Sequence, residues 1–270
     1  MTATAKHDLL NLSPLQPFGM LVYAGRAGMT VLDIPARVIT GWLERHGLLL
    51  FRGYDLLADD EYVEFGERFG SLLQWEFGKI LELKVQPRPA NHIFTAGRVE
   101  LHWDGAFVDT KPHYNVFQCL KGCAAGAGGQ TLFVDTQKAL ATAGAELAGW
   151  RNISIEYAME KKAHYGGTIR SPLIAKNPYN GREVIRYIEA FNEDSDELNP
   201  MQVRVENFSS EASDRFLREF TARLYRDDVM YRHAWQDGDF LIADNACLLH
   251  GRSRFNTADV TRHIKRINIL

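Results

Sequence analysis

A histidine and an aspartate stand one residue apart in the segment LHWDGAF, residues 101–107. In a β-strand, residues i and i+2 point to the same face, so His102 and Asp104 would project together while Trp103 faces the other way. On an inward face an unpaired carboxylate is costly unless a cation compensates it, and a metal ion would do so. Because chance alone predicts about one His-x-acid triplet in this composition, the pair needs further ligands to indicate a site.

His250, in the segment DNACLLHGRSRF (244–255), is the candidate third ligand. It ends an apolar, β-rich run, and we expect Gly251 to break the strand directly after it. The alternative is a histidine satisfied within the core or a turn. Two histidines and one carboxylate on one face of a metal, with open positions opposite, are the arrangement of non-haem iron(II) oxygenases. Zinc would prefer a closed tetrahedron, so iron is the favoured metal.

The last ten residues, TRHIKRINIL, predict a final strand over 261–270. Its alternation would place Arg262, Ile264, Arg266 and Asn268 on one face. If that face is buried, each guanidinium must meet an anion, because arginine keeps its proton. Four residues separate the two arginines by roughly 13 Å, so two different anions are expected. The alternative is an edge strand with both arginines in solvent.

The elements that must position these residues are mostly strands. Helical patterns cover 33–47 and 60–70 early in the chain and 136–152 and 209–228 later. Residues 71–99 indicate strand, loop, strand. Further strands are predicted at 48–54, 113–122, 128–136, 153–160, 183–191 and 238–251. Many strands with scattered helices and no βα alternation favour a mainly β fold with helical insertions (α+β), built on a β-sandwich or closed jelly roll. No linker divides the chain, so residues 1–270 are predicted to form one domain.

Composition limits the classes of function. The net charge is −3 and no Lys/Arg block stands out, so a nucleic-acid partner is not expected. Three cysteines, Cys119, Cys123 and Cys247, are too few for a disulfide framework and lack a second metal-binding pair. No signal peptide or membrane span is readable. These features predict a soluble, cytoplasmic protein with reduced thiols and no membrane partner; a homo-oligomer is compatible with them.

The order of the motifs HWD, GGQTLF and LLH, followed by Arg262, resembles the taurine dioxygenase/TfdA family of iron(II)- and 2-oxoglutarate-dependent oxygenases. The early segments GLLLFRGY and FGERFGSLL extend the resemblance over most of the chain. It implies a double-stranded β-helix (jelly roll) and an enzyme that uses Fe(II), 2-oxoglutarate and O2. It implies His102, Asp104 and His250 as iron ligands. Thr131 and Arg262 match the positions that hold the distal carboxylate of 2-oxoglutarate, and Arg266 matches one that helps bind the acidic end of the substrate.

A narrower resemblance lies in LLQWEFGKILEL (72–83) and HWDGAF, which are similar to the isonitrile-biosynthesis branch of this family. It implies a small, carboxylate-bearing substrate, an aromatic amino acid whose amine has become an isonitrile, such as tyrosine isonitrile. The implied reaction is desaturation, with or without loss of the carboxylate. Within the single domain of residues 1–270, the segment around 75–100 is expected to be a lid-like loop.

Three other functions stay open on the sequence. One is a hydroxylating dioxygenase of the taurine/alkylsulfonate type. Another is a jelly-roll metal-dependent hydrolase, in which metal-bound water is the nucleophile and neither O2 nor 2-oxoglutarate matters. The last is a non-catalytic small-acid-binding protein that keeps the fold.

Overall fold

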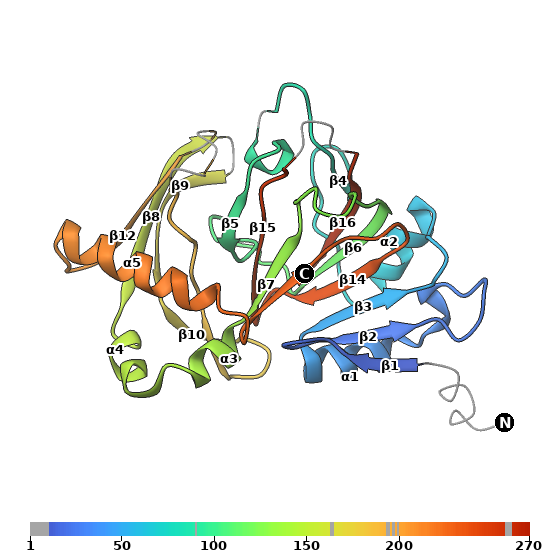
Figure 1. The fold of residues 1–270 in the computed structure, drawn as a ribbon, viewed down its shortest axis with the longest axis horizontal. Helices are drawn as coiled ribbons and strands as arrows, with labels where there is room; N and C mark the ends of the chain where they lie inside the picture. Colours follow the sequence, from blue (N-terminus) through green and yellow to red (C-terminus); the bar gives the residue numbers. More distant parts are fainter. Residues whose placement is uncertain are drawn as a thin grey trace.

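The computed structural model describes residues 11–89, 91–162, 165–192, 195, 198, 200–256 and 261–270. In this part of the chain, two β-sheets of different size enclose a shared apolar core, and helices pack on their outer sides (Figure 1). A smaller sheet and the longest helix form a lobe beside them, at the left in Figure 1. The fold is therefore mainly β with helical insertions around a double-stranded β-helix, as the sequence predicts.

The large sheet has seven strands. From edge to edge they are β1 (Asn11–Pro14), β2 (Met20–Tyr23), β3 (Leu48–Arg52), β14 (Phe240–Asp244), β6 (Tyr114–Lys121), β16 (His263–Ile269) and β4 (Leu81–Leu83). Only the β2–β3 pair is parallel. Because β4 is so short, β16 lies close to the edge of the sheet.

The small sheet has four strands, in the order β13 (Met230–His233), β7 (Thr131–Asp135), β15 (Leu248–Arg252) and β5 (Val99–His102). Alternating residues of both sheets point into the space between them, as the two-residue period of a strand requires. The buried residues of this inter-sheet core are Phe18, Leu21, Leu48, Leu50, Phe117, Cys119, Phe133, Trp235, Leu241, Ala243, Leu248 and Ile264.

Two helices cover the outer face of the large sheet: α1 (Ala36–His46), which follows the 3-10 turn η2 (Val31–Asp33), and α2 (Asp59–Glu67). The first ends at Gly47, whose φ of +68° is the left-handed cap that glycine adopts most readily. The second is fixed to the sheet by Tyr62, whose buried hydroxyl donates to the Val116 carbonyl (2.7 Å). The outer face of β16 is thus packed, and its inner face carries the polar residues Arg266 and Asn268 beside Ile264.

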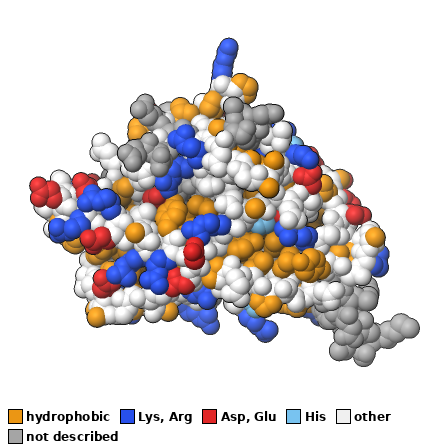
Figure 2. All heavy atoms as spheres, in the orientation of Figure 1, with side chains coloured by type: hydrophobic (Ala, Val, Ile, Leu, Met, Phe, Trp, Pro, Cys, Tyr) orange, Lys and Arg blue, Asp and Glu red, His pale blue; other side chains and the backbone are white. Residues whose placement is uncertain are grey.

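The lobe consists of a sheet in the order β12 (Met201–Val205), β8 (Ser154–Lys162) and β9 (Tyr165–Pro172), with helix α5 (Ser210–Leu224) against it. The short elements nearby are α3 (Thr136–Ala141), η4 (Gly144–Glu146), α4 (Leu147–Trp150), β10 (Ile174–Lys176) and β11 (Glu183–Ile185). Figure 2 shows positive and negative side chains interspersed over the region of α5 and apolar side chains gathered in the middle of the face. No helix in the described residues is both long and apolar enough to span a membrane.

Most predicted elements are confirmed, including the helices at 33–47, 60–70 and 209–228 and the strand–loop–strand of 71–99, whose loop contains η3 (His92–Phe94). The single helix expected over 136–152 is wrong: Gly144, at φ +55°, separates α3 from two shorter pieces. The segment 238–251 forms two strands in different sheets, because the Asp244 carboxylate accepts from Ala246 N (2.7 Å) and turns the chain. Of 183–191, only Glu183–Ile185 is a strand.

Six strands were not predicted: β1, β2, β9, β10, β12 and β13. In β9 the first residue, Tyr165, is followed by two glycines, and β12 alternates between partly buried and exposed residues. Their pairing comes from neighbouring strands rather than from local composition.

Candidate metal centre and anion pocket

The structure brings His102, Asp104 and His250 together between the two sheets. His102 is the last residue of β5, and His250 lies directly opposite it on β15, with the two imidazole centroids 4.3 Å apart. One ligand atom from each of the three side chains lies within 4.8 Å of the other two. This cluster is the one that the sequence predicts.

Both imidazoles present a nitrogen lone pair to the cluster. His102 Nδ1 is 2.7 Å from the Glu100 carbonyl, which directs its Nε2 toward the carboxylate. His250 Nε2 is buried and has no hydrogen-bond partner in the described residues. Burial, aided by His102, lowers the pKa of His250 to about 3, so this ring is neutral at physiological pH and can act as a ligand.

The carboxylate of Asp104 is the anionic member of the cluster. Its Oδ1 lies 3.7 Å from His102 Nε2, and its Oδ2 lies 3.7 Å from His250 Nε2. Oδ2 is also 3.2 Å from Arg266 Nη1 and accepts from Asn268 Nδ2 at 3.2 Å. Burial by itself would raise the pKa of Asp104, but Arg266 and the two histidines outweigh it and hold the pKa well below its usual range.

Asp104 lies in a turn and not in a strand, so the same-strand argument for its position is wrong. Strand β5 ends at His102, and Asn245 fixes the turn: its amide accepts from Asp104 N (2.8 Å) and donates to Asp104 O (3.1 Å). Gly105 follows at φ +87°, where a Cβ would lie 2.9 Å from the Cα of Lys111. The turn returns the carboxylate toward His102, which is the outcome that alternation also predicted.

Strand β15 continues through Gly251 to Arg252, so the expected break after His250 is also wrong. A Cβ on Gly251 would lie 2.6 Å from the Val99 carbonyl. The glycine is therefore needed for the close approach of β5, and the pairing with β5 shifts register at this point.

The free edge of β5 is held by a buried carboxylate, Glu189. Its Oε2 accepts from Leu101 N (3.1 Å), and its own backbone N–H donates to the Leu101 carbonyl (2.8 Å). The charge is balanced by Arg98, whose Nη2 donates to Glu189 Oε1, and Tyr225 donates to the other oxygen at 2.8 Å. The strand that carries His102 is thus paired on both sides.

This set of donors fits a divalent metal ion. It offers two imidazole nitrogens and one carboxylate from elements that are fixed by their own hydrogen bonds. The partnerless, buried Nε2 of His250 is the group that a metal would satisfy.

A second feature lies at the start of β16. Arg262 is 5% exposed, its Nη1 donates to the Gly129 carbonyl (2.8 Å), and its guanidinium sits 5.1 Å from the centroid of the Phe255 ring. Burial lowers its pKa to about 10, which leaves it charged at neutral pH, and no carboxylate in the described residues pairs with it. A buried, unpaired guanidinium fits an incoming carboxylate.

Thr131 begins β7 two residues after Gly129 and is buried. Its Oγ1 accepts from Trp235 Nε1 (2.8 Å), which orients the hydroxyl and leaves its proton available for another acceptor. Thr131 and Arg262 are thus both placed near Gly129, one through the chain and the other through a hydrogen bond.

Comparison with known proteins identifies the family. The model of the taurine catabolism dioxygenase TauD, TfdA family matches residues 12–268. The chain belongs to the TauD/TfdA family.

Within the TauD/TfdA family, three relatives are informative. The 3-((Z)-2-isocyanoethenyl)-1H-indole synthase of Fischerella ambigua is 38% identical over 270 residues, covering 100% of this chain and 98% of the relative. The tyrosine isonitrile desaturase of Pseudomonas aeruginosa is 35% identical over 279 residues, covering 100% and 95%. The solved structure of PvcB, an Fe, α-ketoglutarate-dependent oxygenase from an isonitrile synthetic pathway, superposes with a TM-score of 0.79 at 32% identity, covering 96% of this chain and 91% of that one.

Three residues in this TauD/TfdA site were not predicted from the sequence as contacts of Asp104: Arg266, which was expected only to bind the substrate, Asn245 and Asn268. Asn268 was placed on the inner face of β16, and that position was the available signal. Its Nδ2 lies 2.6 Å from Asn115 Oδ1 on β6 as well as near the carboxylate. Asn245 could not be found by spacing, because it reaches the site across a turn between two sheets.

Proposed function

We propose that the chain is an Fe(II)- and 2-oxoglutarate-dependent oxygenase that desaturates an aromatic amino acid bearing an isonitrile. One observation carries the proposal: a His/Asp/His cluster lies in the same inter-sheet space as a buried guanidinium that has no carboxylate partner in the described residues. His102, Asp104 and His250 are the iron ligands. The family and its isonitrile-related members support the same conclusion.

Arg262 and Thr131 bind the distal carboxylate of 2-oxoglutarate. Arg262 supplies a fixed positive fork for a bidentate pair, and the oriented hydroxyl of Thr131 supplies a third donor. The carboxylate in turn compensates the buried positive charge of Arg262, which has no carboxylate partner in the described residues.

The substrate is a small molecule with a carboxylate. We place that carboxylate at Arg266, whose Nε is buried and has no hydrogen-bond partner in the described residues. The indole-related and tyrosine-related names of the relatives favour an aromatic side chain. The proposal includes a cytoplasmic location and neither nucleic acid nor membrane as a partner.

Iron(II) with 2-oxoglutarate and O2 supplies, when bound, an oxidant that removes hydrogen from carbon. The protein positions the cosubstrate and the substrate and keeps water away from the reacting groups. Arg262 fixes the cosubstrate, Arg266 fixes the substrate carboxylate, and Asn245 and Asn268 keep Asp104 in place. Removal of two hydrogens from adjacent carbons, or of one hydrogen together with the carboxylate, gives the alkene.

We further propose that residues 1–270 act as one domain in which the segment 75–100 is a lid-like loop. The segment runs from the edge of the large sheet to β5. Arg252 holds its second half by donating to the carbonyls of Ile93, Thr95 and Gly97 at 2.7–2.8 Å. This arrangement supports a loop that lies beside the site and is anchored through its second half.

The first experiment is an anaerobic absorption spectrum of the protein with iron(II) and 2-oxoglutarate. A metal-to-ligand charge-transfer band is expected in the wild type. The second measures substrate-triggered O2 consumption and succinate formation with the isonitriles of tyrosine and tryptophan, and with taurine as the comparison. Turnover of taurine alone would favour an alkylsulfonate hydroxylase. Catalysis that requires neither O2 nor 2-oxoglutarate would favour a metal-dependent hydrolase. The absence of both the charge-transfer band and turnover would favour a binding protein.

A further inference from the structure

The loop between Leu73 and Leu81 is hydrogen-bonded at both ends to β16, the strand whose inner face contacts Asp104. At one end, Leu73 N donates to the Asn268 carbonyl (2.9 Å). At the other end, Leu81 on β4 is the antiparallel partner of Arg266. Asn268 and Arg266 are also the two residues of β16 that contact Asp104. The loop therefore leaves and rejoins the sheet beside the metal centre.

The tip of this loop carries a preformed aromatic pair. The rings of Trp75 and Phe77 are stacked with an interplanar angle of 5° and centroids 6.0 Å apart. Trp75 and Gly78 exchange two backbone hydrogen bonds (2.9 and 3.1 Å), which close the tip into a tight turn. Phe77 is nevertheless 63% exposed, so its ring is held in place without being needed for the core.

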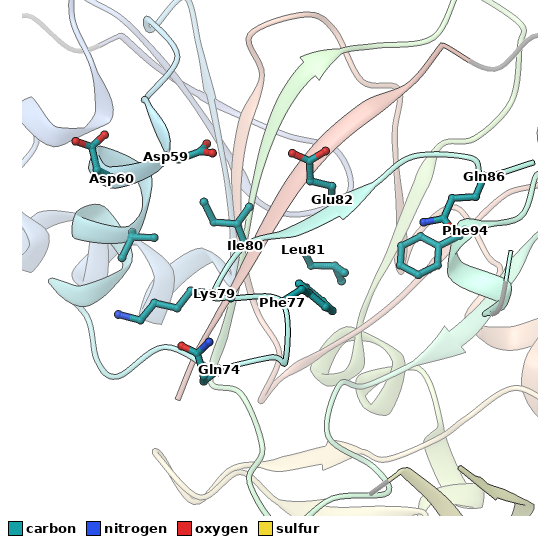
Figure 3. A pocket seen from close by; sticks show the side chains of 12 residues that line it. Asp59, Asp60, Gln74, Phe77, Lys79, Ile80, Leu81, Glu82, Gln86 and Phe94 are labelled. Atoms are coloured by element: carbon teal, nitrogen blue, oxygen red, sulfur yellow. The ribbon is translucent and has the colours of Figure 1, made fainter. Parts of the chain in front are cut away.

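A cavity of about 800 Å³ lies against this loop. Its size is that of pockets that accept a small organic ligand. Figure 3 shows Phe77, Leu81 and Phe94 with Glu82 pointing away from them. The residues that line it are Asp59, Asp60, Val63, Gln74, Phe77, Gly78, Lys79, Ile80, Leu81, Glu82, Gln86 and Phe94.

The alternation of β4 divides this cavity into two parts. Directly opposed residues of an antiparallel pair project to the same side, so Leu81 shares the inner face with Arg266. Ile80 and Glu82 project to the outer face, where Ile80 packs with the core under the helices. The inner part is thus the part that borders Arg266 through Leu81, and the aromatic residues of the lining are Phe77 and Phe94.

We propose that this inner part binds the aromatic ring of the substrate, with Phe77 and Phe94 as ring contacts and Leu81 against the ring. The inference rests on the function proposed above. Arg266 takes the carboxylate, and the ring extends past Leu81 along β4 toward Phe77 and Phe94, while the charged Glu82 of the same strand projects to the outer face. Aromatic rings gain most from such preformed aromatic and aliphatic contacts. Phe77, Leu81 and Phe94 are therefore specificity-determining residues.

The test compares ring-bearing and ring-free ligands in the same protein. Dissociation constants are measured by calorimetry, without O2, on protein loaded with iron(II) and 2-oxoglutarate. The ligands are the isonitrile derivatives of tyrosine, tryptophan and valine. In Phe77→Ala the two aromatic ligands are expected to bind about tenfold more weakly, while the valine derivative changes less than about twofold.

Leu81→Trp fills the inner part and is expected to weaken aromatic binding by more than about tenfold, with the affinity for 2-oxoglutarate unchanged. Phe208→Ala is the control, because Phe208 is also an exposed aromatic (41%) but lies in the lobe next to α5. It should bind all three ligands as the wild type does.

The outcomes separate this inference from the function itself. Aromatic binding that is unchanged in both variants would overturn the ring site and leave the oxygenase standing. An equal loss of affinity for the aromatic and valine ligands in Phe77→Ala would overturn it too, because Phe77 would then not distinguish an aromatic ring from an aliphatic side chain. If no isonitrile triggers O2 consumption in the wild type, the proposed function fails first.

Discussion

Arg266 Nη1 lies 3.2 Å from Oδ2 of Asp104, so the arginine that was expected to bind the acidic end of the substrate is paired with a proposed metal ligand. The pair stabilises the charged form of a buried carboxylate and lowers its pKa. The same guanidinium keeps a buried Nε without a partner in the described residues. Arg266 can therefore hold Asp104 and a substrate anion at once, in the way a fork of several donors allows.

Substitution of Arg266 tests this double role. In Arg266→Gln, substrate affinity should fall by at least about tenfold, because the positive partner of the substrate carboxylate is lost. The affinity for 2-oxoglutarate should stay within a few-fold, the signature of a contact to one ligand only. Titration of each ligand under anaerobic conditions measures both.

Iron binding is the control for this variant. Asn268 still donates to Asp104 Oδ2, and glutamine can supply one more donor, so the metal site should remain assembled. If the 2-oxoglutarate affinity dropped as much as the substrate affinity, Arg266 would be assigned to the cosubstrate instead.

The metal centre itself is tested by removing either imidazole. His102→Ala and His250→Ala should lose iron affinity by more than about 100-fold, since even partners of metal ligands contribute tenfold to 100-fold. Both should lose the charge-transfer band and succinate production while keeping the far-ultraviolet circular dichroism of the wild type. Wild-type succinate production in either variant would contradict the assignment.

The sequence was sufficient for the fold class and for the members of the cluster, for physical reasons that particular residues show. Arg262, Arg266 and Asn268 recur on one face of a strand, and a two-residue period is visible in any sequence. Arg262 and Arg266 are buried, as expected if that face points inward. Thr131 followed from resemblance alone.

Other parts depended on contacts that no local pattern encodes. Asp104 reaches the cluster from a turn held by Asn245, which comes from a distant part of the chain. Gly251 was predicted to break the strand, although it lies within β15, where the lack of a side chain leaves room for the Val99 carbonyl of the neighbouring strand. Tertiary packing decided these positions, so spacing in the sequence could not.

Arg262 is expected to determine the affinity for 2-oxoglutarate. Arg262→Ala should weaken binding by about 2–5 kcal/mol, the usual cost of truncating one partner of a desolvated charge pair. Arg262→Lys should recover only part of this, because a lysine keeps the charge but loses the bidentate fork. The KM for 2-oxoglutarate, measured at saturating substrate, gives the comparison, and the substrate KM serves as the control. Unchanged 2-oxoglutarate kinetics would leave Arg262 as a structural residue that only binds Gly129.

The pH dependence of stability should carry a contribution from His113, which is stacked between Tyr114 and Tyr179 at centroid distances of 3.8 and 3.4 Å. Burial lowers the pKa of His113 from 6.5 to about 4, even though the Asp244 carboxylate lies 4.0 Å away. The unfolded chain therefore binds one more proton than the native protein between about pH 6.5 and 4. Stability should fall as the pH drops through this window, by up to about 1.4 kcal/mol per pH unit.

His113→Gln removes this titration, so its free energy of unfolding should change less between pH 6.5 and pH 5 than that of the wild type. Urea unfolding at both pH values measures the difference, with metal removed from both proteins so that ligand binding does not contribute. Tyr179→Phe keeps the ring that stacks on His113 and should retain the wild-type slope. Equal slopes in the wild type and His113→Gln would show that the imidazole is solvated in the native protein, because only a buried ring has to remain neutral over this range.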